Sequence, residues 1–166
     1  MACRGVLFSI DKETVDRLRA LEGDAARVEY IQEVIEVDYF DRHREWLAET
    51  DKAWDCMHRA LTDGRLEWDN GSYPLNHLIL GGELLYSGDD YIISLKIPQQ
   101  VSDVAAQLPS ITKETFTECF RRVPVSELNG TFEEDRDYTW GWFTEVRDFW
   151  LRAAAEGRFV IFTVDQ

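Results

Sequence analysis

Residues 131–164 read TFEEDRDYTWGWFTEVRDFWLRAAAEG up to Gly157 and RFVIFTV after it, and they contain the strongest structural pattern in the sequence. Thr131 and Glu134 have the spacing of a capping box, which predicts that a helix begins there. The apolar residues that follow recur at helical spacing as far as Gly157, where a glycine can end the helix. The seven residues after it are apolar enough for a buried strand. We therefore expect the chain to close with one long amphipathic helix and one strand.

The rest of the chain combines strand and helix patterns in a less regular order. Residues 5–10 (GVLFSI) predict an opening strand, and residues 83–86 and 91–96 predict a hairpin. Because the predicted strands and helices do not alternate as β-α-β units, their order favours an α+β fold over a doubly wound sheet. The sequence predicts one helix-rich domain over residues 1–166 with a small mixed sheet, in which the strands near the two ends pair.

Two further segments carry predictions that bear on a functional site. Thr50 has the chemistry to cap a helix over residues 51–63, which Gly64 would end. Residues 37–46 contain so many charged side chains that an exposed connection, anchored by its aromatic residues, is expected there.

The net charge is −14, from 32 acidic and 18 basic side chains. A surface of this sign repels nucleic-acid phosphates and anionic membranes, so neither is an expected partner. It attracts and steers a basic protein instead. The alternative is that the acidity only keeps the protein soluble.

The cysteines and the apolar segments indicate the cellular compartment. Cys3, Cys56 and Cys119 are odd in number and form no CxxC pair, which is typical of a reducing environment. Asp11 and Lys12 interrupt the first apolar run too early for a signal peptide, and no later stretch is long enough for a membrane span. The expected location is the cytoplasm. The three histidines lack metal-binding spacing and no cofactor motif is present, so neither a metal nor a cofactor is expected.

The predicted helix over residues 51–63 contains the most informative polar side chains. Asp51, Asp55 and His58 line up on one stripe of it. Because Asp55 and His58 are three residues apart, the carboxylate can orient the imidazole as it would orient a general base. The structural alternative is an ion pair at the edge of a helix. Cys56 lies on a different face from His58, so the two cannot form a local Cys-His pair.

Gly81 and Gly82 form the other conspicuous motif. They are followed by Glu83 and lack the Lys-Ser/Thr of a phosphate-binding loop. We expect them to end a helix before a strand.

Several blocks of the sequence resemble the bacterial YfbM-like proteins, a family catalogued as a domain of unknown function. The most specific are residues 51–64 (DKAWDCMHRALTDG) and the Gly81-Gly82 pair, and residues 5–8 (GVLF) agree with them. The LTDG at the end of the first block is one residue longer than the usual LTG. The resemblance covers nearly the whole chain and implies a single α+β domain of bacterial origin, without an established activity. It suggests that a set of matching residues borders a common surface: Asp51, Lys52, Trp54, His58, Gly81 and Gly82.

The function that we favour from the sequence is a non-catalytic binding module. Its acidic face would dock on a basic protein, and Tyr39, Trp46 and Trp68 are candidate aromatic anchors. The acidic, aromatic composition is similar to that of bacterial immunity proteins, which block toxins by binding them.

The alternative is a small-molecule enzyme or sensor with a pocket near Asp51, Asp55 and His58, close to the glycine pair. It requires that His58 border an open pocket. The sequence identifies no ligand for such a pocket.

Overall fold

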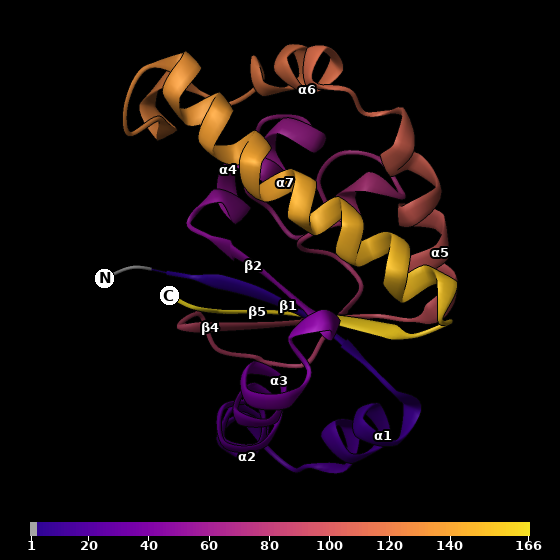
Figure 1. Cartoon of the computed structure of the whole chain (residues 1–166). Helices are drawn as coiled ribbons and strands as arrows, with labels where there is room; N and C mark the ends of the chain where they lie inside the picture. The colour runs from indigo at the N-terminus through magenta and orange to yellow at the C-terminus, as the bar shows by residue number, and fades with distance from the viewer. Residues whose placement is uncertain (1–2) are drawn as a thin grey trace.

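The computed structural model describes residues 3–166, and a five-stranded sheet with the order β2-β1-β5-β4-β3 runs through its centre (Figure 1). The strands are β1 (Gly5–Ile10), β2 (Leu47–Asp51), β3 (Glu83–Leu84), β4 (Tyr91–Lys96) and β5 (Phe159–Asp165). The first and last strands pair with each other, as the sequence predicts. The α+β class is therefore confirmed.

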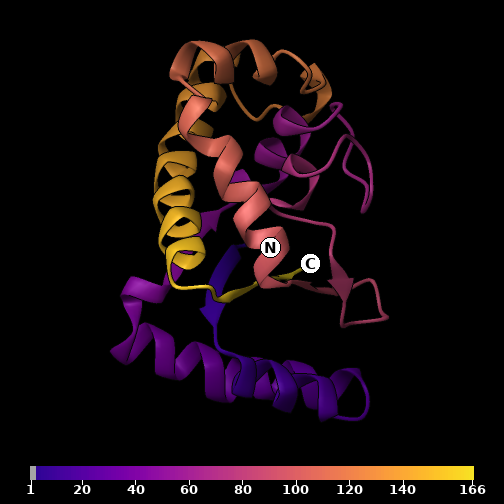
Figure 2. The same cartoon turned by 90° about the vertical axis from the view of Figure 1, so that its right-hand side faces the viewer.

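The sheet is antiparallel at every pair of neighbours, so the prediction of a mixed sheet is wrong. The connection from β1 to β2 shows the reason. The chain leaves β1, passes along the sheet once as a first helix and returns as a second, longer helical segment (Figure 2). Because the two passes run in opposite directions, the chain enters β2 from the end at which it left β1. A parallel neighbour would need a single crossover.

Helices cover both faces of the sheet (Figure 1). The helices are α1 (Lys12–Ala20), α2 (Asp24–Tyr30), α3 (Val37–Arg42), α4 (Ala53–Leu61), α5 (Pro98–Gln107), α6 (Lys113–Phe120) and α7 (Phe132–Ala155). A π-helical segment, η1 (Ile31–Glu36), joins α2 to α3, and short 3-10 turns occur at η2 (Arg44–Trp46), η3 (Leu75–His77), η4 (Leu108–Ser110) and η5 (Val125–Glu127). The helices α1 to α3 lie on one face, and α4 to α7 lie on the other.

Each face of the sheet contributes to its own hydrophobic core. Along β5, Ile161 packs under α1 to α3, whereas its neighbours Val160 and Phe162 pack under the other helices. Successive side chains of a strand point to opposite faces, so a strand covered on both sides is apolar at nearly every position. This explains why residues 158–164 read as one continuous apolar run.

The long helix α7 begins and ends where its sequence signals lie. The Thr131 hydroxyl accepts from the Glu134 backbone N–H at 3.2 Å, and the Glu134 carboxylate accepts from the Thr131 N–H at 2.9 Å. Gly157, with φ +61°, follows its end. Pro98 is the first residue of α5, a position that suits the fixed φ of proline.

The prediction that Thr50 caps a helix beginning at Asp51 is wrong. Thr50 lies in β2, where its hydroxyl donates to the Gly5 carbonyl at 2.8 Å, and α4 begins only at Ala53. Thr50 is skipped in the pairing of β1 with β2, because Gly5 pairs with Asp51 and Val6 with Glu49. Such a bulge ends the strand by bending it, and a local sequence pattern does not reveal it.

Residues 37–46 are also not the exposed connection that their charges predict. Most of them continue the helical segment that starts at Asp24 and ends at Arg42. Ile31, Ile35 and Tyr39 are buried at intervals of four residues and face the sheet. An α-helical turn takes fewer than four residues and a π-helical turn takes more than four. Because the segment combines both kinds of turn, residues at intervals of four stay on the side that faces the sheet. Burial of this row outweighs the preference of the charged residues for a loop.

Candidate functional site

Asp51 lies at the junction between β2 and α4, in a backbone conformation that only a few non-glycine residues adopt. Its φ is +47°. One carboxylate oxygen accepts from the Tyr138 hydroxyl at 2.6 Å, and the other lies 3.2 Å from the Nε of Arg4. Asp51 therefore ties the residue before β1, the end of β2 and the second turn of α7 together.

Lys52 is exposed directly after this turn and lies between two surface hollows. One, of about 360 Å³, is shared with Cys56 and Tyr138, and the other, of about 330 Å³, is shared with Trp54 and Asp55. Trp54 itself is mostly buried and donates from its ring nitrogen to the Cys3 carbonyl at 3.0 Å. Burial raises the pKa of the Cys56 thiol to about 12, so this group is not an activated thiolate.

Asp55 does not orient His58, which corrects the proposed base and orienter. Its carboxylate accepts from the Nε of Arg59 at 2.5 Å, and Arg59 is also 3.4 Å from the Glu127 carboxylate. Asp55 pairs with Arg59, its i,i+4 neighbour, and not with His58, its i,i+3 neighbour, because His58 points inward. The structural alternative, an ion pair along the helix, describes Asp55 correctly, with Arg59 as the partner.

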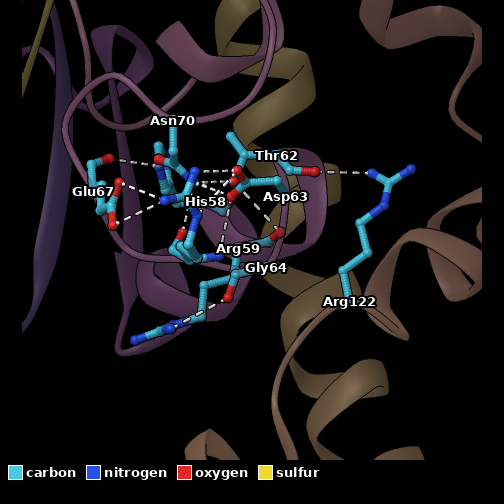
Figure 3. Close-up of polar contacts among 9 residues, drawn as sticks. His58, Arg59, Thr62, Asp63, Gly64, Glu67, Asn70 and Arg122 are labelled. Atoms are coloured by element: carbon cyan, nitrogen blue, oxygen red, sulfur yellow. Dashed lines mark hydrogen bonds and ion pairs between the residues drawn. The ribbon is translucent and has the colours of Figure 1, made fainter.

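His58 is only 1% exposed and belongs to a buried polar network (Figure 3). Its Nε2 donates to the Asn70 side-chain oxygen at 2.7 Å and to the Glu67 carbonyl at 3.0 Å. The Asn70 amide nitrogen donates to Thr62 and Asp63 at 3.0 and 2.6 Å. The network fastens the irregular segment after α4 onto the helix. The requirement that His58 border an open pocket is therefore not met.

The protonation of His58 follows from this network. Both partners of Nε2 are acceptors, so Nε2 carries the hydrogen, and Nδ1 is buried without a hydrogen-bond partner among residues 3–166. Burial lowers the pKa of His58, and the bonds to Asn70 and Glu67 oppose this shift in part. A neutral, sealed imidazole has a structural role.

Gly81 and Gly82 lie at the opposite edge of the sheet from Asp51. They precede β3, whereas Asp51 ends β2, and these two strands are the outermost of the five. Both glycines have positive φ, and a Cβ on Gly82 would lie 2.3 Å from the Leu95 carbonyl oxygen. The pair thus allows a close approach to β4. It precedes a strand as predicted, but it follows the 3-10 turn η3 rather than a full helix.

The structure therefore brings together four of the seven predicted site residues. Asp51, Lys52, Trp54 and Asp55 border hollows at the β2–α4 junction. His58 is sealed below them, and the glycine pair lies across the sheet. A common surface for all of the matching residues is not formed. Among residues 3–166, no group of three His, Cys, Asp or Glu side chains is placed to hold a metal ion.

A second surface, missed in the sequence, lies on the outer side of the segment from α2 to α3. Residues 29–41 contain five carboxylates and no basic side chain. Residues 29, 33, 37 and 41 recur at intervals of four and are exposed, and so is residue 34 beside them. We call this set the acidic face: Glu29, Glu33, Val34, Val37 and Asp41. The two valines are 46% and 52% exposed. The buried row at positions 31, 35 and 39 was the signal that could have revealed this face.

The carboxylates of the acidic face are free to meet a partner. No ion pair within the described part of the chain engages Glu29, Glu33 or Asp41. Asp38, beside them, is 3.9 Å from Arg42 and 3.6 Å from His43. Val34 and Val37 thus form a small apolar centre surrounded by carboxylates that have no ion-pair partner among the described residues. Protein interfaces with an apolar core and a polar rim have this composition.

The predicted aromatic anchors do not lie on this surface as free side chains. Tyr39 is buried and its hydroxyl donates to the Ser9 carbonyl at 2.8 Å. Trp46 is covered by the guanidinium of Arg158, 4.5 Å from its ring centroid, and Trp68 packs against the core under α4 to α7. Tyr39 is therefore not an exposed anchor, whereas Trp46 and Trp68 are half-buried and are packed within the fold in part. No helix of residues 3–166 is long and apolar enough to cross a membrane.

Comparisons with known proteins agree with the resemblance seen in the sequence. The model of a family described as a domain of unknown function, DUF1877, matches residues 1–163. A similar solved structure is that of YfbM from Escherichia coli, a protein of unknown function. It has a TM-score of 0.63 and 18% sequence identity, and the match covers 99% of each chain. At this identity the likeness concerns the fold. No curated protein matches the sequence.

Proposed function

The chain belongs to the DUF1877 family, and we propose that it is a non-catalytic binding module that docks a basic protein on its acidic face. The observation that carries the proposal is the exposure of Val34 and Val37 beside Glu29, Glu33 and Asp41, which make no ion pair within residues 3–166. Binding would itself be the function, as it is for an immunity protein. The proposal places the protein in the cytoplasm, where the thiols of Cys56 and Cys119 stay reduced.

Charge and apolar area have separate roles in this proposal. The net charge of −14 steers a basic partner toward the molecule and raises the rate of association. The two valines then supply the dry centre of the contact, with Glu29, Glu33 and Asp41 as its rim. The complex should therefore weaken in salt, since charges on a rim are screened over about 8 Å at physiological ionic strength and about 3 Å at 1 M.

The support for a basic partner is the imbalance of charge along one helical face. An acidic or nucleic-acid partner would add like charges opposite Glu29, Glu33 and Asp41. A wholly apolar partner would leave these carboxylates desolvated without compensation. A protein surface that combines lysine or arginine with a small apolar group satisfies both requirements.

The proposal is tested by affinity capture from a lysate of the source organism at low and high salt, followed by binding measurements with the purified partner. The matched variants are Val37→Arg on the acidic face and Val125→Arg on η5, where the valine is 84% exposed on the other helical layer. We expect a basic partner that high salt releases. Val37→Arg should weaken its binding at least about tenfold, or about 1.4 kcal/mol, and Val125→Arg should leave it unchanged. An acidic partner, or equal binding by the two variants, would overturn the proposal.

The enzyme or sensor built on His58 finds no comparable support. Its imidazole is buried, and its polar partners are a backbone carbonyl and an asparagine. We therefore do not propose catalysis at this histidine.

A further inference from the structure

A hollow of about 410 Å³ lies on the other helical layer, away from the acidic face. The end of α4, the loop that contains Tyr73 and Pro74, the last residue of α5 and the segment after α6 meet around it. The side chains that give it its chemistry are Asp63, Ser72, Tyr73, Gln107 and Arg122. These residues come from four separate parts of the chain, so only the folded molecule forms this site.

Arg122 is held in place by the backbone, and part of its guanidinium is unused. Its Nη1 donates to the Ala60 carbonyl at 3.1 Å, where α4 ends. It also donates to the Thr62 carbonyl at 3.1 Å (Figure 3). These two bonds account for both hydrogens of Nη1. Within residues 3–166, no hydrogen bond or ion pair engages Nε or Nη2. The free Nε–Nη2 edge is a fork that matches the two oxygens of a carboxylate.

The carboxylate that lines the hollow does not compete for this fork. One oxygen of Asp63 accepts from the Asn70 side chain at 2.6 Å, and the other accepts from Nη2 of Arg65 at 2.7 Å. The hydrogen bonds from Arg65 have the largest effect on the pKa of Asp63, and the hydrogen bond from Asn70 has the next largest. Together they hold this pKa well below its usual value. The charge of Asp63 is thus already compensated by Arg65 and Asn70.

The remaining walls provide neutral donors and an aromatic surface. Ser72 and Gln107 line the hollow, and the Ser72 hydroxyl and the Gln107 amide have no hydrogen-bond partner among the described residues. Tyr73 is 50% exposed, and its hydroxyl is fixed because it donates to Asp103 at 2.5 Å. The ring of His77 supports the Tyr73 ring edge to face, with their centroids 5.0 Å apart. A flat apolar body can therefore lie against Tyr73 while its polar end meets the fork.

We propose that this hollow binds a small organic carboxylate, held by the Nε–Nη2 edge of Arg122, with a planar apolar body against Tyr73. A single negative charge fits better than a phosphate dianion, because Arg122 is the one basic side chain among the described residues that line the hollow. The inference goes beyond docking of a protein partner and does not depend on it, since no residue of the acidic face lines this hollow.

The test is a titration of the full chain with benzoate, followed by the backbone amide signals in NMR spectra. Benzamide serves as the neutral isostere and phenyl phosphate as the dianion. We expect benzoate to bind in about the millimolar range and to shift the amides around residues 62, 72, 107 and 122. Benzamide should bind at least tenfold more weakly. Tighter binding of phenyl phosphate than of benzoate would overturn the choice of a carboxylate.

Two variants locate the site, and a matched variant controls for charge. Arg122→Gln keeps an amide donor for the α4 carbonyls but removes the fork, and Tyr73→Ala removes the aromatic wall. Each should weaken benzoate binding at least fivefold. Arg121→Gln, which removes the neighbouring exposed arginine that pairs with Glu118, should leave it unchanged. If Arg122→Gln unfolds the chain, the affinity of Tyr73→Ala for benzoate still tests whether the ligand binds in this hollow. Equal affinities for the wild type and Tyr73→Ala, or equal losses in Arg121→Gln and Arg122→Gln, would overturn the inference.

Discussion

Lys96 is the residue whose chemistry departs most from its usual behaviour. It is fully buried in β4, and its amine donates to the Ile79 carbonyl and to the Ser94 hydroxyl. The ring centroid of Phe162 lies 6.0 Å from the amine, and no ion pair within the described residues engages it. Burial lowers the pKa of Lys96 well below 10.5. Two hydrogen bonds satisfy a neutral amine, whereas a charged one would remain uncompensated.

Lys96 should therefore make stability depend on pH on the alkaline side. In the unfolded chain this lysine is protonated below pH 10.5, whereas in the folded chain it stays neutral until the pH falls to its lowered pKa. The free energy of unfolding therefore falls as the pH drops below 10.5. The expected slope is about 1.4 kcal/mol per pH unit, down to the folded pKa. Urea unfolding at a series of pH values measures it. Lys96→Met should lose this slope, whereas Lys52→Met, at an exposed lysine, should keep it. An unchanged slope in Lys96→Met would contradict a neutral buried amine.

Asn70 connects His58, Thr62 and Asp63 and should be important for stability. Asn70→Ala leaves the buried Nε2 of His58 without its 2.7 Å partner, so a loss of about 2–3 kcal/mol in the free energy of unfolding is expected. The matched control is Asn129→Ala at an exposed asparagine, which should change stability by less than about 0.5 kcal/mol. Urea unfolding of both variants at neutral pH is the measurement. Similar values for the two variants would mean that the network contributes little.

The seven candidate residues show what a sequence can and cannot place at this scale. Asp51, Lys52, Trp54 and Asp55 are neighbours in the chain, so their proximity in space was nearly assured. The direction of each side chain was not, because it depends on where α4 begins and on which face of it meets the core. His58 turned inward for this reason. Arg122 had no local signal, since its partners are the carbonyls of Ala60 and Thr62.

At the scale of elements, α7 contains a glycine that can be replaced with benefit. A Cβ on Gly141 would meet nothing within 4 Å, and the residue lies in the helix interior. Gly141→Ala should stabilise the protein by about 0.5–1 kcal/mol, because alanine loses less backbone entropy on folding. Thermal unfolding measures the change.

Gly5→Ala in β1 is the contrasting variant. A Cβ there would lie 2.6 Å from the Thr50 hydroxyl and 2.6 Å from the Phe162 ring. A loss of about 1–3 kcal/mol is expected from this crowding. A gain in stability from Gly5→Ala would contradict the packing of β2 against β1 at the bulge.

Elements with signals at both ends were predictable, and those set by tertiary contacts were not. The capping box at Thr131 and the glycine at position 157 define α7 from the sequence alone. The bulge at Thr50 has no such signal, since it arises from the pairing of two strands that lie far apart in the sequence. Along residues 29–41 the charges were visible, but their position on one outward face depends on burial of Ile31, Ile35 and Tyr39 against the sheet.

At the scale of the whole molecule, one sheet supports two helical layers with different surfaces. The layer of α1 to α3 presents the acidic face, and the layer of α4 to α7 contains the hollow beside Arg122. A protein partner on one side and a small ligand on the other would not compete for the same residues. The sequence predicted the fold class and the overall sign of the charge. It did not predict this division, because the order of strands in the sheet decides which helices cover which face.

The net charge of −14 gives salt two opposite effects, which separate the proposed function from simple solubility. Screening relieves the self-repulsion of the folded chain, so NaCl should raise the midpoint of thermal unfolding by about 2–4 °C, or on the order of 1 kcal/mol. The same screening should weaken a basic partner. If the complex dissociates in salt while the fold becomes more stable, the cause is therefore screening of the electrostatic contact and not unfolding of the protein. Replacing Glu29 and Glu33 by Gln should reduce both effects, whereas the same change at Glu133 and Glu145 on α7 should reduce only the effect on stability. If both pairs weaken the partner equally, association depends on total charge, and the acidic face is not its site.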